Sequence, residues 1–401
     1  MFGCYPFRAV RTRSSGPVTG FPGTGAQGGY VDHHVHFMAS VAAGLSIDVS
    51  ASTSLRDLLG RLGDGIDQGA GNLSGGWIRA WGYDEALMQE GTHPTRWDLD
   101  RVCRSKDGED VPLVLHHRSG HVAVLNSAAL RQLDSEDHHD GVMFDGHDVL
   151  AGTPKLDIAA LTSAAMSLSR KWAAAGIGAF VDATHTNGPG ELDLMARWCV
   201  EEVVAQDVEM MVGLDHIHQV PPYGTVVAGL SAAGSGRLSV GPVKLMPLPG
   251  RLGGLETAVA EAHGEGFPVA VHVVDVETLQ VTLEAFAKSP PPSGLTDRLE
   301  HNALSLPEQV RAIADSGARV VVNPGFLATR KVKYLRELSE IERGWLIRMR
   351  SLVDAGVDLR AGSDSPVSAA DPEQIIRCAT NHPFAPGESL SPAAATSLLS
   401  R

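Results

Sequence analysis

An alternation of short apolar runs with amphipathic segments constrains the fold of this chain more than any other feature. It begins near residue 155. The segments between the runs, such as LETAVAEAHGEG and SLPEQVRAIADSG, each close on a glycine, as helices often do. Strands that alternate with helices indicate a parallel sheet covered on its faces. The candidate strands are GIGAFVDAT (176–184), VEMMVGLDH (208–216), VGPVKLM (240–246), FPVAVHVV (267–274), RLEH (298–301), RVVVNPG (319–325) and VDLRAGSD (357–364).

Two further strand candidates lie upstream. VDHHVHF (31–37) provides a first strand, and VPLVLHHR (111–118) a second. Together they bring the count to about eight strand–helix units, which predicts a closed (β/α)8 barrel of the TIM type. A doubly wound open sheet is the alternative, but no GxGxxG follows the first strand, and candidate functional residues follow many strands. Both observations favour the barrel.

The stretch from about residue 40 to about residue 110 interrupts the alternation. It contains a helical segment, SLRDLLGRLGDGIDQ, and then GGWIRAWGYDEALMQEGTHPTRWDLDRV, which is rich in tryptophan, glycine and proline. We interpret it as an insertion after the first strand, at the end of the barrel where active sites lie. The predicted organisation is an irregular segment at 1–29 and a barrel at 30–401 that contains the insertion.

Charge and composition limit the classes of partner. The formal net charge of −14 argues against nucleic-acid binding through a basic surface. No apolar run approaches the roughly 18 residues of a membrane-spanning helix, and the N-terminus lacks the apolar core of a signal peptide. The four cysteines are scattered, as expected for reduced thiols in a cytoplasmic protein. We expect a small-molecule substrate, no nucleic-acid or membrane partner, and either a monomer or a homodimer.

The heptapeptide VDHHVHF carries a candidate metal-binding pair. Side chains alternate along a strand, so Asp32, His34 and His36 share one face, and His33 points to the other. Two imidazoles on one face can reach a single ion at about 2.0–2.1 Å from each nitrogen. Asp32 could accept the second ring N–H of one ligand and thereby fix its tautomer. A histidine-rich strand end without any ligand is the alternative.

Other candidate residues follow the later strands. The separations between Lys244 and His272, and between His272 and His301, are 28 and 29 residues, close to one strand–helix unit each. In a barrel all carboxyl ends of the strands open onto one mouth, so these residues would converge there. The complete set is His34, His36, His121, Asp182, His185, His216, Lys244, His272, His301 and Asp364.

In this order, the segments HHVHF, VKLM, AVHVV, RLEHNALS and AGSDSPV resemble the metal-dependent amidohydrolase superfamily. GYDE, HPTRWDLDRV and PLVLHHRSGHVAVLNSAAL are similar to its amidohydrolase 3 branch. The resemblance runs from about Gly29 to Pro372. It implies a barrel that hydrolyses a non-peptide C–N bond with one or two divalent ions, usually zinc. The bond would be an amide, N-acyl or cyclic amide bond.

The resemblance also implies roles for individual residues. His34, His36, His272 and His301 would be metal ligands, and Lys244 would bridge two ions when carbamylated. Asp364 would touch the metal and act as the general base. The family often has Asp-Gly after this lysine, whereas this chain has LMPLPG, which leaves the choice between one ion and two open.

The chemistry of these residue types agrees with those roles. A divalent ion lowers the pKa of bound water to about 7 and polarises a carbonyl. Asp364 can accept the proton of that water and pass it to the leaving nitrogen. His121, Tyr83 and Asp84 are candidate substrate contacts, although packing is an equal alternative for His121. Structural roles are favoured for Asp182, His185, His216 and His218.

Two alternative functions use the same residues. One is a deaminase acting on an amino-substituted heterocycle. The other is a non-catalytic, metal-binding remnant of a shortened amidohydrolase, because 33 residues before His34 and 37 after Asp364 leave little room for the β-sandwich that usually flanks the barrel. We therefore expect the sandwich to be reduced or absent.

Overall fold

The computed structural model describes residues 29–103, 110–144, 147–227, 237–247, 250 and 252–401. Its largest sheet contains eight parallel strands in the order β1-β7-β8-β10-β11-β12-β13-β14. The two outer strands meet, because the Asp364 N–H donates to the carbonyl of His34 at 2.7 Å and Val35 pairs with Ser365. The strands are β1 (Tyr30–Val35), β7 (Ile177–Asp182), β8 (Asp207–Gly213), β10 (Leu238–Leu245), β11 (Val269–Val273), β12 (Arg298–His301), β13 (Arg319–Val322) and β14 (Leu359–Ala361), with a short antiparallel β9 (Val226–Val227) beside β10.

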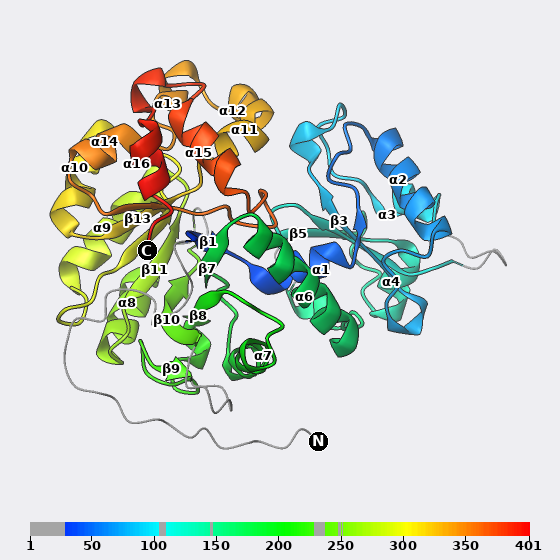
Figure 1. The fold of residues 1–401 in the computed structure, drawn as a ribbon. Coiled ribbons are helices and arrows are strands. Elements are labelled where there is room, and N and C mark those ends of the chain that lie inside the picture. The colour runs from blue at the N-terminus through cyan, green and yellow to red at the C-terminus, as the bar shows by residue number, and fades with distance from the viewer. Residues whose placement is uncertain (1–28, 104–109, 145–146, 228–236, 248–249, 251) are drawn as a thin grey trace.

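Helices surround this sheet, which confirms the predicted (β/α)8 barrel (Figure 1). Their ends follow local sequence signals: Asp157 and Asp275 accept hydrogen bonds as N-caps, and Gly317 ends a helix in the left-handed region. Buried Val, Leu and Ile side chains between strands and helices form the main core. The helices are α6 (Ile158–Ala174), α7 (Pro189–Val200), α8 (Leu255–Gly264), α9 (Val276–Lys288), α10 (Pro307–Ser316), α11 (Phe326–Thr329), α12 (Lys331–Glu337), α13 (Glu340–Arg343), α14 (Met349–Asp354), α15 (Pro372–Thr380) and α16 (Pro392–Ser397), with 3-10 turns η3 (Leu214–His216) and η4 (Pro386–Glu388).

A second sheet lies beside the barrel, on the right in Figure 1, and is formed by residues between β1 and β7. Its strands, in spatial order, are β2 (Ile47–Asp48), β3 (Ile78–Tyr83), β4 (Leu113–His117), β5 (Val122–Leu125) and β6 (Val142–Phe144). It has its own core, which includes Leu58, Leu99 and Leu115. The accompanying helices are α1 (Phe37–Gly44), α2 (Leu55–Asp67), α3 (Arg96–Asp100), α4 (Ser127–Gln132) and α5 (His147–Leu150), with 3-10 turns η1 (Ser74–Gly76) and η2 (Glu85–Leu87).

The prediction that VPLVLHHR forms the second barrel strand is wrong. Residues 113–117 form β4, which pairs with β3 in parallel and with β5 in antiparallel orientation. A strand buried on both faces shows the same apolar run in whichever sheet it lies, so the pattern could not assign the sheet. The second sheet extends to Phe144, beyond the insertion expected at about 40–110.

The C-terminal helix packs close to the first strand. Leu399 accepts a hydrogen bond from Val31 N–H, and Leu398 accepts one from Ala361 N–H. Ser391 caps α16 and Pro392 is its first residue, as the sequence indicates. Within the described residues, the strands belong to these two sheets, without a separate flanking sandwich.

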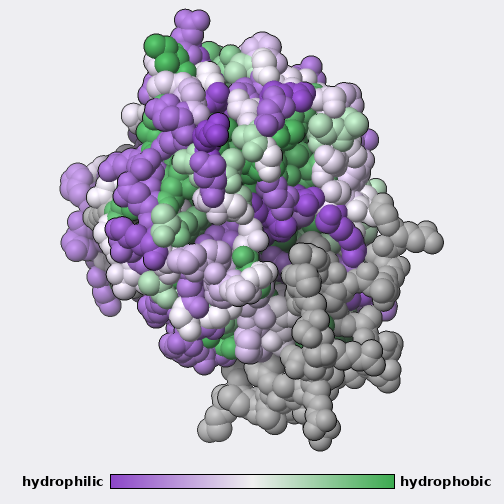
Figure 2. Space-filling view, turned by 90° about the vertical axis from the view of Figure 1, so that its left-hand side faces the viewer, coloured by the Kyte–Doolittle hydropathy of each residue, from purple (hydrophilic) through white to green (hydrophobic). Residues whose placement is uncertain are grey.

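The outer surface agrees with the amphipathic pattern of the helices. On the face seen in Figure 2, hydrophilic side chains surround smaller apolar patches. No helix in the described part of the chain combines the length and apolar character that a membrane crossing requires.

Candidate metal centre

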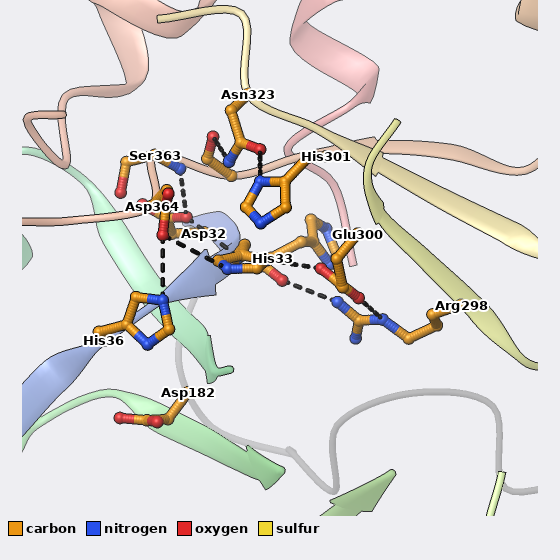
Figure 3. Close-up of polar contacts among 12 residues, drawn as sticks. Asp32, His33, His36, Asp182, Arg298, Glu300, His301, Asn323, Ser363 and Asp364 are labelled. Atoms are coloured by element: carbon orange, nitrogen blue, oxygen red, sulfur yellow. Dashed lines mark hydrogen bonds and ion pairs between the residues drawn. The ribbon is translucent and has the colours of Figure 1, made fainter. Parts of the chain in front are cut away.

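The first strand brings two of its histidines to the carboxyl end of the barrel. His34 Nε2 lies 3.4 Å from Asp364 Oδ1, and His36 Nε2 lies 3.1 Å from the same oxygen (Figure 3). His33 points the other way and its Nε2 contacts the Ser400 carbonyl at 2.9 Å. Burial and the charge of Arg298 lower the pKa of His33 to about 3. The alternation of faces expected for VDHHVHF is therefore present.

A buried carboxylate fixes the tautomer of His34. His34 Nδ1 lies 2.5 Å from Glu300 Oε2, and Arg298 donates to the other oxygen of Glu300 at 2.7 Å. Although burial raises the pKa of Glu300, Arg298 and His34 hold it well below its usual range. An ionised Glu300 accepts the Nδ1–H, which leaves Nε2 as the His34 ring nitrogen that faces Asp364.

The expectation that Asp32 would accept a ring N–H of a ligand is wrong. Asp32 Oδ1 instead accepts the backbone N–H groups of Ser363 at 2.8 Å and His34 at 3.3 Å. Burial raises the pKa of Asp32 to about 6. Asp32 thus joins β1 to the segment after β14 and does not orient an imidazole.

Glu300 was not among the residues singled out from the sequence. Alternation in RLEH places Glu300 and His301 on opposite faces. His301 has a φ of 70°, outside strand geometry, and both side chains reach His34. Asp364 also has a positive φ, of 60°. Backbone strain of this kind occurs at functional sites, and strand alternation does not predict it.

His36 and His301 also have partners at the second ring nitrogen. His36 Nδ1 lies 2.9 Å from Thr184 Oγ1. His301 Nδ1 lies 2.7 Å from Asn323 Oδ1, and the Asn323 amide in turn donates to the Gly362 carbonyl. Because Asn323 Oδ1 can only accept, His301 carries its proton on Nδ1 and leaves Nε2 free.

Of the other two candidate histidines, His301 lies next to His34 and His272 lies next to His301. The ring centroids of His34 and His301 are 4.6 Å apart, and those of His301 and His272 are 4.5 Å apart. Burial lowers the pKa of His301 to about 3 and that of His272 well below its ordinary value. Both rings are therefore neutral, the form that binds a metal. In the described residues, the potential ligand atoms of His34, His36 and Asp364 lie within 4.8 Å of one another, a group that does not include His272 or His301.

Lys244 extends from β10 into the same interior. It is 2% exposed, and its Nζ has no hydrogen-bond partner among the described residues. Burial lowers its pKa to about 8, although Glu300 and Asp364 oppose the shift. An amine with this pKa is largely neutral in mildly alkaline solution.

A divalent cation would satisfy atoms that are otherwise unpaired. His34 Nε2 and Asp364 Oδ1 are shielded from solvent and lack hydrogen bonds to described residues. Burial raises the pKa of Asp364, but His34 and His36 lower it more, so the carboxyl group is ionised. Two imidazole nitrogens and one carboxylate oxygen are a donor set typical of zinc sites. The residues present therefore fit a metal.

The remaining candidates occupy different positions. The His121 ring lies 6.5 Å from the His272 ring, so the second sheet reaches the mouth of the barrel. Tyr83 and Asp84 lie in a separate polar cluster with His93 and His117. Substrate contacts by His121, Tyr83 and Asp84 stay predictions.

Asp182, given a structural role above, has such contacts. Its carboxylate accepts hydrogen bonds from Phe37 N–H, Thr184 N–H and the Asn187 amide. It therefore fastens the start of α1 to the end of β7. His216 packs against Gly188, where a Cβ would lie 2.8 Å from the His216 ring, and exposed His218 lies 3.6 Å from Glu265.

Comparisons with known proteins agree with this geometry. A model of the amidohydrolase family matches residues 28–400. The Bacillus subtilis protein called "Putative amidohydrolase YtcJ" is 22% identical over 384 residues, which cover 86% of this chain and 71% of that protein. The N-substituted formamide deformylase of Arthrobacter pascens is 25% identical over 415 aligned residues, covering 91% of this chain and 75% of the relative.

Solved structures share the fold. An uncharacterized metal-dependent hydrolase from Pyrococcus furiosus superposes with a TM-score of 0.68 at 21% identity, over 92% of this chain and 80% of that one. Its counterpart from Pyrococcus horikoshii has a TM-score of 0.69 at 19% identity, with the same coverage. At these identities the likeness concerns the fold.

Proposed function

Because the chain belongs to the amidohydrolase family, we propose that it is a metal-dependent hydrolase of a small molecule, cleaving a non-peptide carbon–nitrogen bond. The bond is an amide, N-acyl or cyclic amide bond. One observation carries the proposal: the Nε2 atoms of His34 and His36 lie 3.4 and 3.1 Å from Asp364 Oδ1 at the carboxyl end of the barrel, and His34 Nε2 and Asp364 Oδ1 are buried without hydrogen bonds to described residues.

The proposed ligands are His34, His36, His272, His301 and Asp364, holding one or two divalent ions, of which zinc fits the donor set best. When bound, the metal supplies an acidified water and a Lewis acid for the substrate carbonyl. Glu300, Thr184 and Asn323 keep the second nitrogens of three ligand rings occupied, so those rings cannot rotate away from the centre.

Asp364 is the proposed general base. Its Oδ1 faces His34 and His36, which leaves Oδ2 to take a proton from the attacking water. The lowered pKa keeps the carboxylate ionised at neutral pH, ready to accept that proton. The same oxygen can then deliver the proton to the leaving nitrogen.

A carbon–nitrogen bond is preferred because of the relatives and of the site. The Arthrobacter pascens relative is named for deformylating N-substituted formamides, which are N-acyl amines. His121, from the second sheet, lies at the mouth and is the proposed contact to the part of the substrate away from the reacting carbonyl. Tyr83 and Asp84 are proposed to act from the same sheet, further from the centre.

The test is turnover by zinc-reconstituted protein with N-substituted formamides, other N-acyl amines, cyclic amides and aminoheterocycles. We expect hydrolysis of one of the first three classes, which gives an amine and an acid from a formamide or N-acyl amine and a ring-opened amino acid from a cyclic amide. Asp364→Asn should retain most of its zinc and lose about 10²–10⁴-fold in rate, because an amide cannot accept the proton. Elemental analysis of the same samples provides the control.

Two outcomes would replace the proposal. Ammonia release from aminoheterocycles alone would show a deaminase. No turnover of any class by protein with its full zinc content would show a non-catalytic metal-binding protein. A rate loss below about tenfold in Asp364→Asn would assign the proton transfer to another group.

A further inference from the structure

A second cluster of imidazole and carboxylate groups lies in the inserted sheet, outside the barrel. Tyr83 ends β3 and is followed directly by Asp84 and Glu85, while His117 ends the neighbouring strand β4. His117 Nε2 lies 2.9 Å from Glu85 Oε2 and 3.7 Å from Asp84 Oδ1. His93 Nδ1 lies 3.5 Å from Glu85 Oε2. Asp84, Glu85 and His117 thus surround one point, and His93 lies beside them with its Nδ1 also 3.2 Å from the Tyr83 hydroxyl.

The spacing of these atoms matches that of a metal site. Ligand atoms at about 2.0–2.2 Å from a tetrahedral ion lie roughly 3.3–3.6 Å from one another. The separations of 2.9, 3.5 and 3.7 Å bracket this value, and those around Asp364 in the barrel, 3.1 and 3.4 Å, are similar. The potential ligand atoms of Asp84, Glu85 and His117 lie within 4.8 Å of one another.

The same atoms also lack hydrogen bonds. Glu85 Oε2 and His117 Nε2 are shielded from solvent, and neither has a partner of hydrogen-bond geometry among the described residues, although they lie 2.9 Å apart. The His117 side chain is only 9% exposed. His34 Nε2 and Asp364 Oδ1 show the same combination in the barrel.

We propose that Asp84, Glu85 and His117 bind a divalent cation of the zinc type. Imidazole and carboxylate together favour zinc over magnesium or calcium, which prefer oxygen ligands. Ser119 Oγ lies 2.7 Å from His117 Nδ1, and the Ser119 N–H donates to the same nitrogen at 3.0 Å, so the second ring nitrogen of His117 is held by Ser119. An ion pair between protonated His117 and the two carboxylates is the competing arrangement.

The ion would join the ends of β3 and β4 at the edge facing the barrel mouth. His117 and Ser119 precede His121 in the turn between β4 and β5, and His121 approaches His272. A cation at His117 would therefore hold this turn in place. The site shares no ligand with the barrel centre, so metal binding here can be measured separately from binding of the proposed barrel ion.

Zinc stoichiometry of the full chain tests the proposal. Metal-free wild type, Glu85→Gln, His117→Ala and His218→Ala are dialysed against zinc and analysed by elemental analysis. His218 is the matched control, because it forms an exposed imidazole–carboxylate pair with Glu265 at 3.6 Å. We expect Glu85→Gln and His117→Ala to lose about one zinc ion per chain and His218→Ala to lose none.

A second comparison separates the two centres. His34→Ala/His36→Ala, which disables the barrel site, should retain about one zinc, and adding Glu85→Gln to it should remove that ion. Circular dichroism checks that each variant is folded. If His117→Ala unfolds, the zinc content of the nearly isosteric Glu85→Gln variant provides the test. Equal zinc content in wild type and folded Glu85→Gln would overturn the proposal and leave the ion pair as the explanation.

Discussion

Single residues in the first strand differ sharply in what they contact. His34 faces Asp364 and Glu300, whereas adjacent His33 contacts a backbone carbonyl near the C-terminus. We expect His34→Ala to remove the barrel metal, because too few ligand bonds remain. His33→Ala should keep it. Zinc analysis of both variants in the Glu85→Gln background isolates this centre, and loss of metal from His33→Ala alone would contradict the assignment of faces.

Lys244 is expected to form a carbamate that binds a metal ion. Burial lowers its pKa to about 8, so near pH 8 about half of the amine is neutral and can react with carbon dioxide to form a carbamate. We expect bicarbonate at pH 8 to raise the zinc content of the wild type by about one ion per chain, because the carbamate adds an anionic oxygen ligand. Lys244→Ala should show no such increase. A bicarbonate-independent zinc content in the wild type would assign Lys244 a structural role and the barrel a single ion.

At the scale of elements, the order of the barrel strands could be predicted because each is an apolar run followed by a helix. The candidate ligands could also be located, since they follow those runs. The sheet to which Leu113–His117 belongs could not be predicted, because burial on both faces gives the same pattern in either sheet. Glu300 could not be predicted as a contact of His34, because alternation places it on the face opposite His301. The two side chains both reach His34 since His301 leaves strand geometry at a positive φ.

The turn between β4 and β5 carries His121 close to the ring of the candidate ligand His272. His121 lies 6.5 Å from the ring of His272, too far to replace a ligand bond but close enough to contact a substrate between them. We expect His121→Ala to raise KM about tenfold with a smaller change in kcat, and to leave the zinc content unchanged. Steady-state kinetics on the substrate identified above measure both constants. An unchanged KM would indicate that His121 only packs against the barrel.

At the scale of the whole molecule, the proposed barrel ion joins the two strands that close the barrel. His34 lies in β1, His36 follows directly after it, and Asp364 follows β14. Two backbone hydrogen bonds close the barrel at the carboxyl ends of these strands. Asp364 N–H donates to His34 O at 2.7 Å, and His36 N–H donates to Ser365 O at 2.8 Å. A cation bound to all three side chains therefore stabilises the closed ring against separation of β1 from β14.

Metal removal should consequently lower the melting temperature. A ligand at 100 times its Kd stabilises a protein by about 2.7 kcal/mol, which corresponds to about 3 °C for a chain of 401 residues. We expect calorimetry of zinc-loaded and chelator-treated protein to show at least such a difference in the Glu85→Gln background, where only the barrel centre contributes. The shift should vanish in Glu85→Gln/His36→Ala. Equal melting temperatures with and without zinc in Glu85→Gln would mean that the barrel closes without help from a metal, and that its ligands serve chemistry alone.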